Sequence, residues 1–117
     1  MKRGDLVTIA VAGDYGKPRP ALVVQADAFS ALSSVTVLRL TSEVHDWPAF
    51  RVMVQPSALN GLRKPSQVMI DRAIALPRHK LGAVFGCLDN ATMSVVSEAL
   101  LVFFGLGISA AHSRSPM

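Results

Sequence analysis

The chain has 117 residues, half of them apolar and 17% charged, with a formal net charge of +4 and a pI near 9.8. This length suits one domain with its own core, and this apolar content excludes general disorder. The longest apolar run, residues 99–104, falls far short of the roughly 20 residues that span a bilayer, and the first residues lack a signal-peptide core. We therefore expect a soluble, cytoplasmic protein with no membrane association.

Six short segments carry the pattern of β-strands, at residues 6–11, 20–24, 35–40, 50–55, 66–71 and 81–88. The second is apolar almost throughout, which is typical of a strand buried on both faces. The third alternates, so that Arg39 shares one face with Val35 and Val37. The last is the weakest prediction, because Gly82 and Gly86 interrupt it.

The connections follow from turn chemistry. Residues 13–18 form the first turn, in which the glycines are free to adopt positive φ and Pro18 excludes a central-strand position. A polar loop containing Asn60 and Gly61 separates the fourth and fifth strands, and Asp71 ends the fifth.

One helix is predicted at about residues 89–104. Asp89 or Asn90 provides the N-cap, and Gly105 is placed to end the helix in a left-handed conformation. The apolar residues at helical spacing, which we expect to close the core, are Met93, Val96, Leu100 and Phe103. Many short strands and one terminal helix favour a mainly β protein, a small barrel, over residues 1–106. Periodicity is lost beyond it, which predicts a partly ordered tail at 107–117.

Cysteine and histidine usage bounds the chemistry. Cys87 has no partner for a disulfide and is best interpreted as a small buried residue of a strand. His45, His79 and His112 are scattered without ligand spacing, so we predict no metal site and no cofactor.

Three polar residues stand at strand ends. Arg19 lies between Pro18 and Pro20, which restrict the backbone around a guanidinium suited to phosphate. Thr41 offers a hydroxyl where a strand leaves the sheet, and Asp71 precedes Arg72. A surface arginine, a turn hydroxyl and a structural ion pair explain these residues equally well from spacing alone.

Positive charge concentrates in one third of the chain, at Arg63, Lys64, Arg72, Arg78, His79 and Lys80. Such a cluster favours a polyanionic partner, although a solvated face is the simpler interpretation of charge alone.

Several motifs then occur in a fixed order: Arg-Gly-Asp-Leu-Val at 3–7, Arg-Pro-Ala-Leu-Val-Val at 19–24 with Asp-Ala-Phe at 27–29, Leu-Thr-Ser at 40–42, Gly-Leu at 61–62 with Ser-Gln-Val at 66–68, Leu-Asp at 88–89, and Glu-Ala-Leu at 98–100 with Gly-Leu at 105–106. Together they resemble the MazF/PemK (Kid) toxin family over residues 2–106. The opening, the Arg-Pro strand and the Thr-Ser strand end make the resemblance specific.

The resemblance implies an SH3-like barrel of the MazF/CcdB type with a C-terminal helix, a homodimer, and an antitoxin partner that blocks the active groove. It also implies sequence-selective cleavage of single-stranded RNA without a metal, by attack of the ribose 2′-hydroxyl on the adjacent phosphate. That reaction requires a proton acceptor, a proton donor and positive charge near phosphorus.

Carried over position by position, the resemblance makes Arg19, Thr41 and Asp71 the catalytic residues. Arg19 would stabilise charge, Thr41 would steady the phosphoryl oxygens, and Asp71 would be the base. The residues assigned to RNA binding are Lys17, Ser42, Lys64, Ser66, Gln67, Arg72, Arg78 and Lys80. The sequence departs from its relatives in three places: a short first loop without histidine, Met69 in place of a second arginine, and Ile74 in place of a basic residue.

Two alternatives remain. A CcdB-like gyrase poison performs no chemistry and uses an aromatic-glycine chain end, to which residues 101–106 are similar, although they are not terminal. A non-catalytic SH3-like binding module would need an aromatic cage, for which one Trp and one Tyr provide little material.

Overall fold

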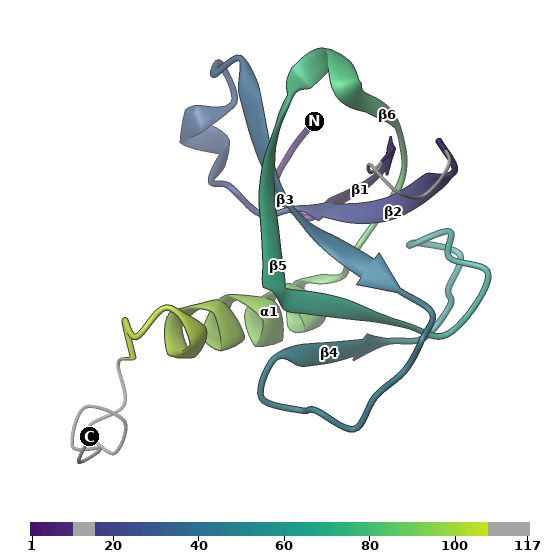
Figure 1. Cartoon of the computed structure of the whole chain (residues 1–117), viewed down its shortest axis with the longest axis vertical. Coiled ribbons are helices and arrows are strands. Elements are labelled where there is room, and N and C mark those ends of the chain that lie inside the picture. Colours follow the sequence, from purple (N-terminus) through teal and green to yellow (C-terminus); the bar gives the residue numbers. More distant parts are fainter. Residues whose placement is uncertain (11–15, 108–117) are drawn as a thin grey trace.

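A computed structural model describes residues 1–10 and 16–107. Within these residues the chain forms one six-stranded antiparallel sheet and one α-helix (Figure 1). The elements are β1 (Asp5–Ala10), β2 (Pro18–Val23), η1 (Asp27–Phe29), β3 (Ser34–Thr41), β4 (Arg51–Val54), β5 (Ser66–Pro77), η2 (Arg78–Lys80), β6 (Leu81–Cys87) and α1 (Asn90–Phe103). The predictions for residues 11 and 13–15 and for the tail beyond 107 lie outside the described residues.

The sheet has the strand order β4-β5-β3-β2-β1-β6 and curls on itself because β5 is long and bent (Figure 1). The first half of β5 pairs with β4 and with the end of β3, whereas the second half of β5 pairs with the start of β3. A register shift between Leu38 and Leu40 accompanies the change, as a bulge bends a strand. The prediction that Asp71 ends this strand was wrong, since β5 continues to Pro77. In the described chain β4 and β6 do not pair, so the predicted barrel is an open, barrel-like sheet.

The sheet buries apolar residues on both faces, and successive side chains of β3 point alternately into two core clusters. The first cluster lies under α1 and comprises Leu6, Leu22, Val24, Leu38, Leu40, Val52, Val54, Val68, Ile70, Leu88 and Val96. The second occupies the opposite face and comprises Val7, Ile9, Ala21, Val23, Val35 and Val37. The predicted separation of Val35 and Val37 from Leu38 and Leu40 is confirmed.

The prediction that Pro18 belongs to the first turn was wrong. Pro18 and Pro20 both lie in β2, which has neighbours on both sides of the sheet. They pair with β1 at Ala10 and Thr8, but pairing with β3 begins only at Ala21. The strand is therefore an edge at its first residues, where a missing backbone N–H is tolerated.

Strand β6 contains both glycines that weakened its prediction. A side chain at Gly86 would place its Cβ 2.3 Å from the carbonyl oxygen of Asn60. Gly86 therefore allows the 55–65 loop to approach β6 closely. The buried Asn60 side chain stabilises this loop through hydrogen bonds to the main chain of Ser57, Gln55 and Leu62.

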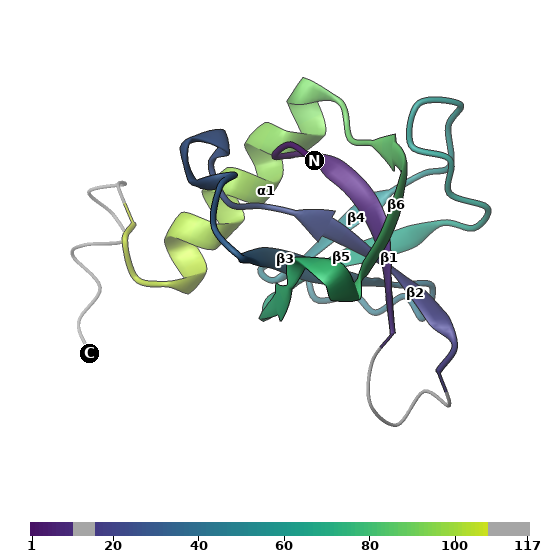
Figure 2. The same cartoon turned by 90° about the horizontal axis from the view of Figure 1, so that it is seen from above.

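Helix α1 lies along one side of the sheet (Figure 2). Its predicted ends are confirmed: the Asp89 carboxylate accepts the Thr92 backbone N–H at 2.6 Å, and Gly105 has a φ of +71°. Val96 is fully buried and Met93 and Leu100 pack beside it, but Phe103 is 48% exposed, so its assignment to the core was wrong. No helix among the described residues is long and apolar enough to cross a membrane.

Candidate active-site groove

Neighbouring strands change from apolar to polar along one face of the sheet. Ala21 of β2 belongs to the second core cluster, and Arg19 precedes it on the same face. In β3, Val37 belongs to that cluster, and Arg39 and Thr41 follow it on its face. The core of this face therefore gives way to cationic and hydroxyl groups at the end of β3.

The edge of the sheet extends this polar region. Met69 and Asp71 of β5 lie on the face away from the first core cluster, and Arg51 of β4 pairs directly opposite Met69. Guanidinium groups from β2, β3 and β4 thus face the same side of the sheet.

These residues enclose a groove made of two adjoining cavities. The first has a volume of about 430 Å³ and is lined by Arg19, Pro20, Arg39, Leu40, Thr41, Ser42, Glu43, Leu62, Arg63, Lys64, Ser66 and Met69. The second, about 270 Å³, is lined by Arg39, Thr41, Glu43, His45, Trp47, Arg51, Met69 and Arg72. Arg39, Thr41, Glu43 and Met69 line both, so the junction lies at the end of β3.

Thr41 has a role in the turn as well as a place in the groove. Its hydroxyl accepts the backbone N–H of Glu43 at 3.0 Å, which is the turn chemistry expected of threonine. A hydroxyl that accepts one bond still has its own proton to donate. The turn therefore fixes the position of Thr41 at the junction of the cavities.

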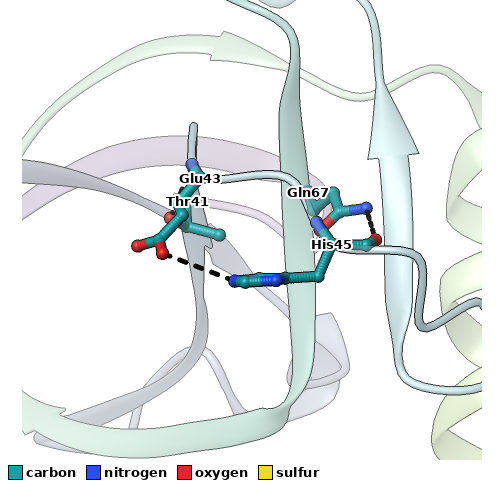
Figure 3. Close-up of polar contacts among 4 residues, drawn as sticks. All are labelled: Thr41, Glu43, His45 and Gln67. Carbon is teal, nitrogen blue, oxygen red and sulfur yellow. Dashed lines mark hydrogen bonds and ion pairs between the residues drawn. The ribbon is translucent and has the colours of Figure 1, made fainter.

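Gln67 fixes the segment between β3 and β4. The residue is 6% exposed, and its side-chain amide accepts the backbone N–H of His45 at 3.0 Å and donates to the His45 carbonyl at 2.7 Å. Figure 3 shows the His45 ring reaching toward the Glu43 carboxylate while Gln67 holds the main chain at the base of that ring. The structure thus places Gln67 as a clamp, with both ends of its amide engaged.

Asp71 lies between two arginines. One carboxylate oxygen is 3.6 Å from Nε of the buried Arg51, and the other is 3.6 Å from Nε of Arg72. Arg51 also lies over the rings of Trp47 and Phe50, at 5.0 and 5.6 Å from their centroids. The structural ion pair considered from the sequence is therefore present.

The structure divides the predicted RNA-binding residues. Those that line the groove are Ser42, Lys64, Ser66 and Arg72, although Ser66 is buried and its hydroxyl donates to the Lys64 carbonyl. Lys17, Arg78 and Lys80 line neither cavity. The Arg78 guanidinium donates instead to the carbonyls of Ser30 and Leu32, at 2.6 and 2.8 Å.

Comparison with known proteins identifies the family. The family model of PemK-like, MazF-like toxins of type II toxin-antitoxin systems matches residues 2–104. The chain belongs to this family. The resemblance expected from the sequence motifs is thereby confirmed.

Individual relatives agree with this assignment. This MazF-like chain is 42% identical over 107 residues to a probable endoribonuclease MazF of Mycolicibacterium smegmatis, covering 91% of this chain and 98% of the relative. A solved endoribonuclease in complex with its cognate antitoxin, from a mycobacterial species, is 25% identical with a TM-score of 0.78, covering 93% of this chain and 99% of that one. The Mycobacterium tuberculosis toxin MazF-mt6 is 30% identical with a TM-score of 0.70, covering 84% and 94%.

The structure explains two positions at which this MazF-like chain differs from its relatives. Met69 is 7% exposed and lines both cavities, with Arg51 opposite it on the neighbouring strand. Ile74 packs against the second core cluster, so an apolar residue suits that position.

Sequence reasoning missed several groove residues. Arg39 was placed on the correct face of its strand but was given no role, and Glu43, His45, Trp47 and Arg51 were not selected. The His45 and Trp47 rings stack at 4.1 Å with an interplanar angle of 6°. The single Trp, with a histidine two residues before it and an arginine four residues after it, was the available signal.

The described residues contain no group of three or more His, Cys, Asp or Glu side chains arranged to hold a metal ion. Cys87 is half-buried in β6, a less complete burial than the sequence interpretation expected.

Proposed function

We propose that this chain is the toxin of a toxin–antitoxin pair and acts as an endoribonuclease on single-stranded RNA in the cytoplasm. The observation that carries the proposal is the groove in which Arg19 and Arg39 flank Thr41, in a chain 42% identical to a probable endoribonuclease. A groove lined by several cations suits a phosphodiester backbone.

The chemistry follows from the residues at the junction. The scissile phosphate lies beside Thr41, with the guanidinium of Arg19 stabilising the charge that develops on its oxygens. The 2′-hydroxyl of the preceding ribose attacks phosphorus, so neither a metal nor an activated water is required. The assignment of the base to Asp71 by family resemblance stays a prediction.

A defined oligonucleotide tests this reaction. The protein should cleave mixed-sequence single-stranded RNA equally well with and without chelator, and deoxyribose at the cleaved position should abolish cutting. Cleavage of the deoxy-substituted strand would contradict 2′-hydroxyl attack. Intact RNA together with gyrase-dependent DNA breaks would instead support the gyrase-poison alternative.

We also propose that the chain forms a homodimer and that a cognate antitoxin blocks the groove. Val95, Val102, Phe103 and Phe104 of the helix region are 39–57% exposed, which favours an apolar contact between copies. Light scattering should give twice the chain mass at micromolar concentration, and a monomer would contradict the dimer. The purified antitoxin should inhibit RNA cleavage at equimolar ratio, and undiminished cleavage would contradict groove blocking.

A further inference from the structure

The proposed reaction requires two proton transfers, and the described groove contains one pair of side chains suited to both. The arginines of the groove stabilise the negative charge that develops on the phosphate, but a guanidinium has only donors and does not accept the proton of the 2′-hydroxyl. Asp71 has both oxygens in ion pairs with Arg51 and Arg72. Glu43 and His45 line the same groove, with 3.5 Å between the Glu43 Oε1 and the His45 Nε2.

The positions of Glu43 and His45 suit different partners of the reaction. Glu43 lines both cavities with a side chain that is 81% exposed and lies beside Thr41 (Figure 3). His45 lines only the second cavity, with a side chain that is 36% exposed. In-line attack needs the base and the acid on opposite sides of phosphorus, so the 3.5 Å Glu43–His45 contact must open to admit the phosphate, with the carboxylate on the junction side and the imidazole on the side of the second cavity.

The imidazole is held more firmly than a surface histidine. Gln67 binds both main-chain groups of His45, and the ring stacks on Trp47 at 4.1 Å. Such preorganisation is what proton transfer to a bound substrate requires. Histidine is also the side chain that most readily exchanges a proton near neutral pH.

The charges that face this pair come from every neighbouring element. Arg39 of β3, Arg51 of β4 and Arg72 of β5 line the second cavity with His45. The first cavity, which Glu43 also lines, adds Arg19 of β2 and the loop residues Arg63 and Lys64. Asp71 lies behind Arg51 and Arg72 and pairs with both. The surroundings thus combine guanidinium groups for the phosphate with one carboxylate–imidazole pair for the protons.

We propose that Glu43 is the base and His45 the acid of the reaction, an inference that rests on the proposed ribonuclease function. The Glu43 carboxylate takes the proton of the 2′-hydroxyl as the O2′–P bond forms. The P–O5′ bond breaks, and the imidazolium of His45 donates its proton to the leaving 5′-oxygen. The products are a 2′,3′-cyclic phosphate and a 5′-hydroxyl, and transfer of the proton from Glu43 to His45 restores the starting state.

The first experiment measures single-turnover cleavage against pH for the wild type, Glu43→Gln, His45→Gln and Asp71→Asn. The wild type should give a bell-shaped profile, because the base must be unprotonated and the acid protonated. Glu43→Gln should lose the acidic limb, His45→Gln the alkaline limb, and each should cost about a hundredfold or more in rate. Asp71→Asn should keep both limbs.

The second experiment separates the acid from a merely structural residue. In RNA with sulfur in place of the bridging 5′-oxygen, the leaving thiolate needs no proton. His45→Gln should then cleave within a few-fold of the wild type, whereas Glu43→Gln should stay slow. His79→Gln and Glu98→Gln are matched controls, because both residues are exposed and line neither cavity, and both variants should cleave normally.

The outcomes distinguish this inference from the proposed function. A wild type that cleaves RNA while His45→Gln or Glu43→Gln retains full activity would overturn the assignment and leave the ribonuclease function standing. Loss of one limb in Asp71→Asn alone would assign that proton to Asp71 instead. A wild type that cleaves no RNA would overturn the proposed function itself.

Discussion

Two basic regions of the molecule lie at opposite ends of strand β3. At one end, Arg39 and Thr41 face the groove together with Arg19. At the other, Ser34 pairs with Pro77, and Arg78 follows with its backbone N–H bound to the Ser33 carbonyl at 2.8 Å. The eight residues of β3 separate the two regions by roughly 23 Å, at about 3.3 Å for each step along a strand.

The difference between these regions lies in whether the guanidinium lines the groove. Arg78 donates to two carbonyls in the 30–33 segment and holds that segment against the turn after β5. The groove cations instead line a cavity large enough for a nucleotide backbone. The sequence assigned Arg78 to RNA binding together with the groove cations, and only its hydrogen bonds to the Ser30 and Leu32 carbonyls set it apart as a structural residue.

The largest expected effect comes from replacing one arginine in each region. Arg19→Ala should lower the cleavage rate by about a hundredfold or about 3 kcal/mol, because one charge-assisted contact to the transition state is lost. Arg19→Lys should recover only part of it, since an ammonium lacks the planar fork. Arg78→Ala should cleave normally but lose about 1 kcal/mol of stability. Cleavage assays measure the rates and denaturant unfolding measures the stabilities. Equal cleavage rates for the two alanine variants would contradict the assignment of Arg19 to the active groove and of Arg78 to a structural contact.

The clamp at Gln67 offers the next largest effect. Gln67→Ala should release the main chain at His45 and reduce cleavage by about tenfold to a hundredfold, because a displaced catalytic loop loses its orientation. Hydrogen exchange should rise at the amide of His45. Gln55→Ala is the matched control, since Gln55 is exposed and lines neither groove cavity. Unchanged exchange and rate in Gln67→Ala would show that the loop needs no clamp.

Salt dependence sharpens the comparison with a smaller effect. Lys64→Ala and Arg72→Ala should each reduce the slope of log affinity against log salt by about 0.7 for single-stranded RNA, since each phosphate contact releases counterions. Lys80→Ala should leave the slope unchanged, because Lys80 lies outside the groove. Fluorescence anisotropy with a non-cleavable deoxy-substituted oligonucleotide measures the slope. An equal loss in Lys80→Ala would extend the binding surface to the turn after β5.

The smallest effect concerns the helix, which lies outside both regions. The hydrogen bond from the Thr92 backbone N–H lowers the pKa of Asp89 below its ordinary 3.8. A carboxylate with a lowered pKa in the folded state stabilises the fold above pH 3.8 and loses that contribution as pH falls through the folded-state pKa. Asp89→Ala should therefore melt below the wild type at pH 7, and the gap should narrow toward pH 2. Cleavage at pH 7 should not change, and a pH-independent gap would contradict the charged cap.

The elements followed from local patterns. Four features were predicted correctly because each depends on residues close in the chain: the alternation in β3, the apolar run of β2, the Asp89 cap and the end of the helix at Gly105. Errors arose where a distant strand decided the outcome. Pro18 is tolerated in β2 because β3 pairs only from Ala21 onward, and β5 runs past Asp71 because β3 offers it a second partner.

The sequence by itself determined the family and the mainly β fold, and it selected Arg19 and Thr41 as candidate site residues, since these inferences depend on ordered motifs and on residue type. Only the tertiary structure decided which charges share a groove. Arg39, Arg51 and His45 come from β3, β4 and the loop between them, and pairing with β5 brings them to one face. Gln67 became a clamp and Arg78 a loop tie because their hydrogen-bond partners, 22 and 46–48 residues away, are set by strand register rather than by local sequence.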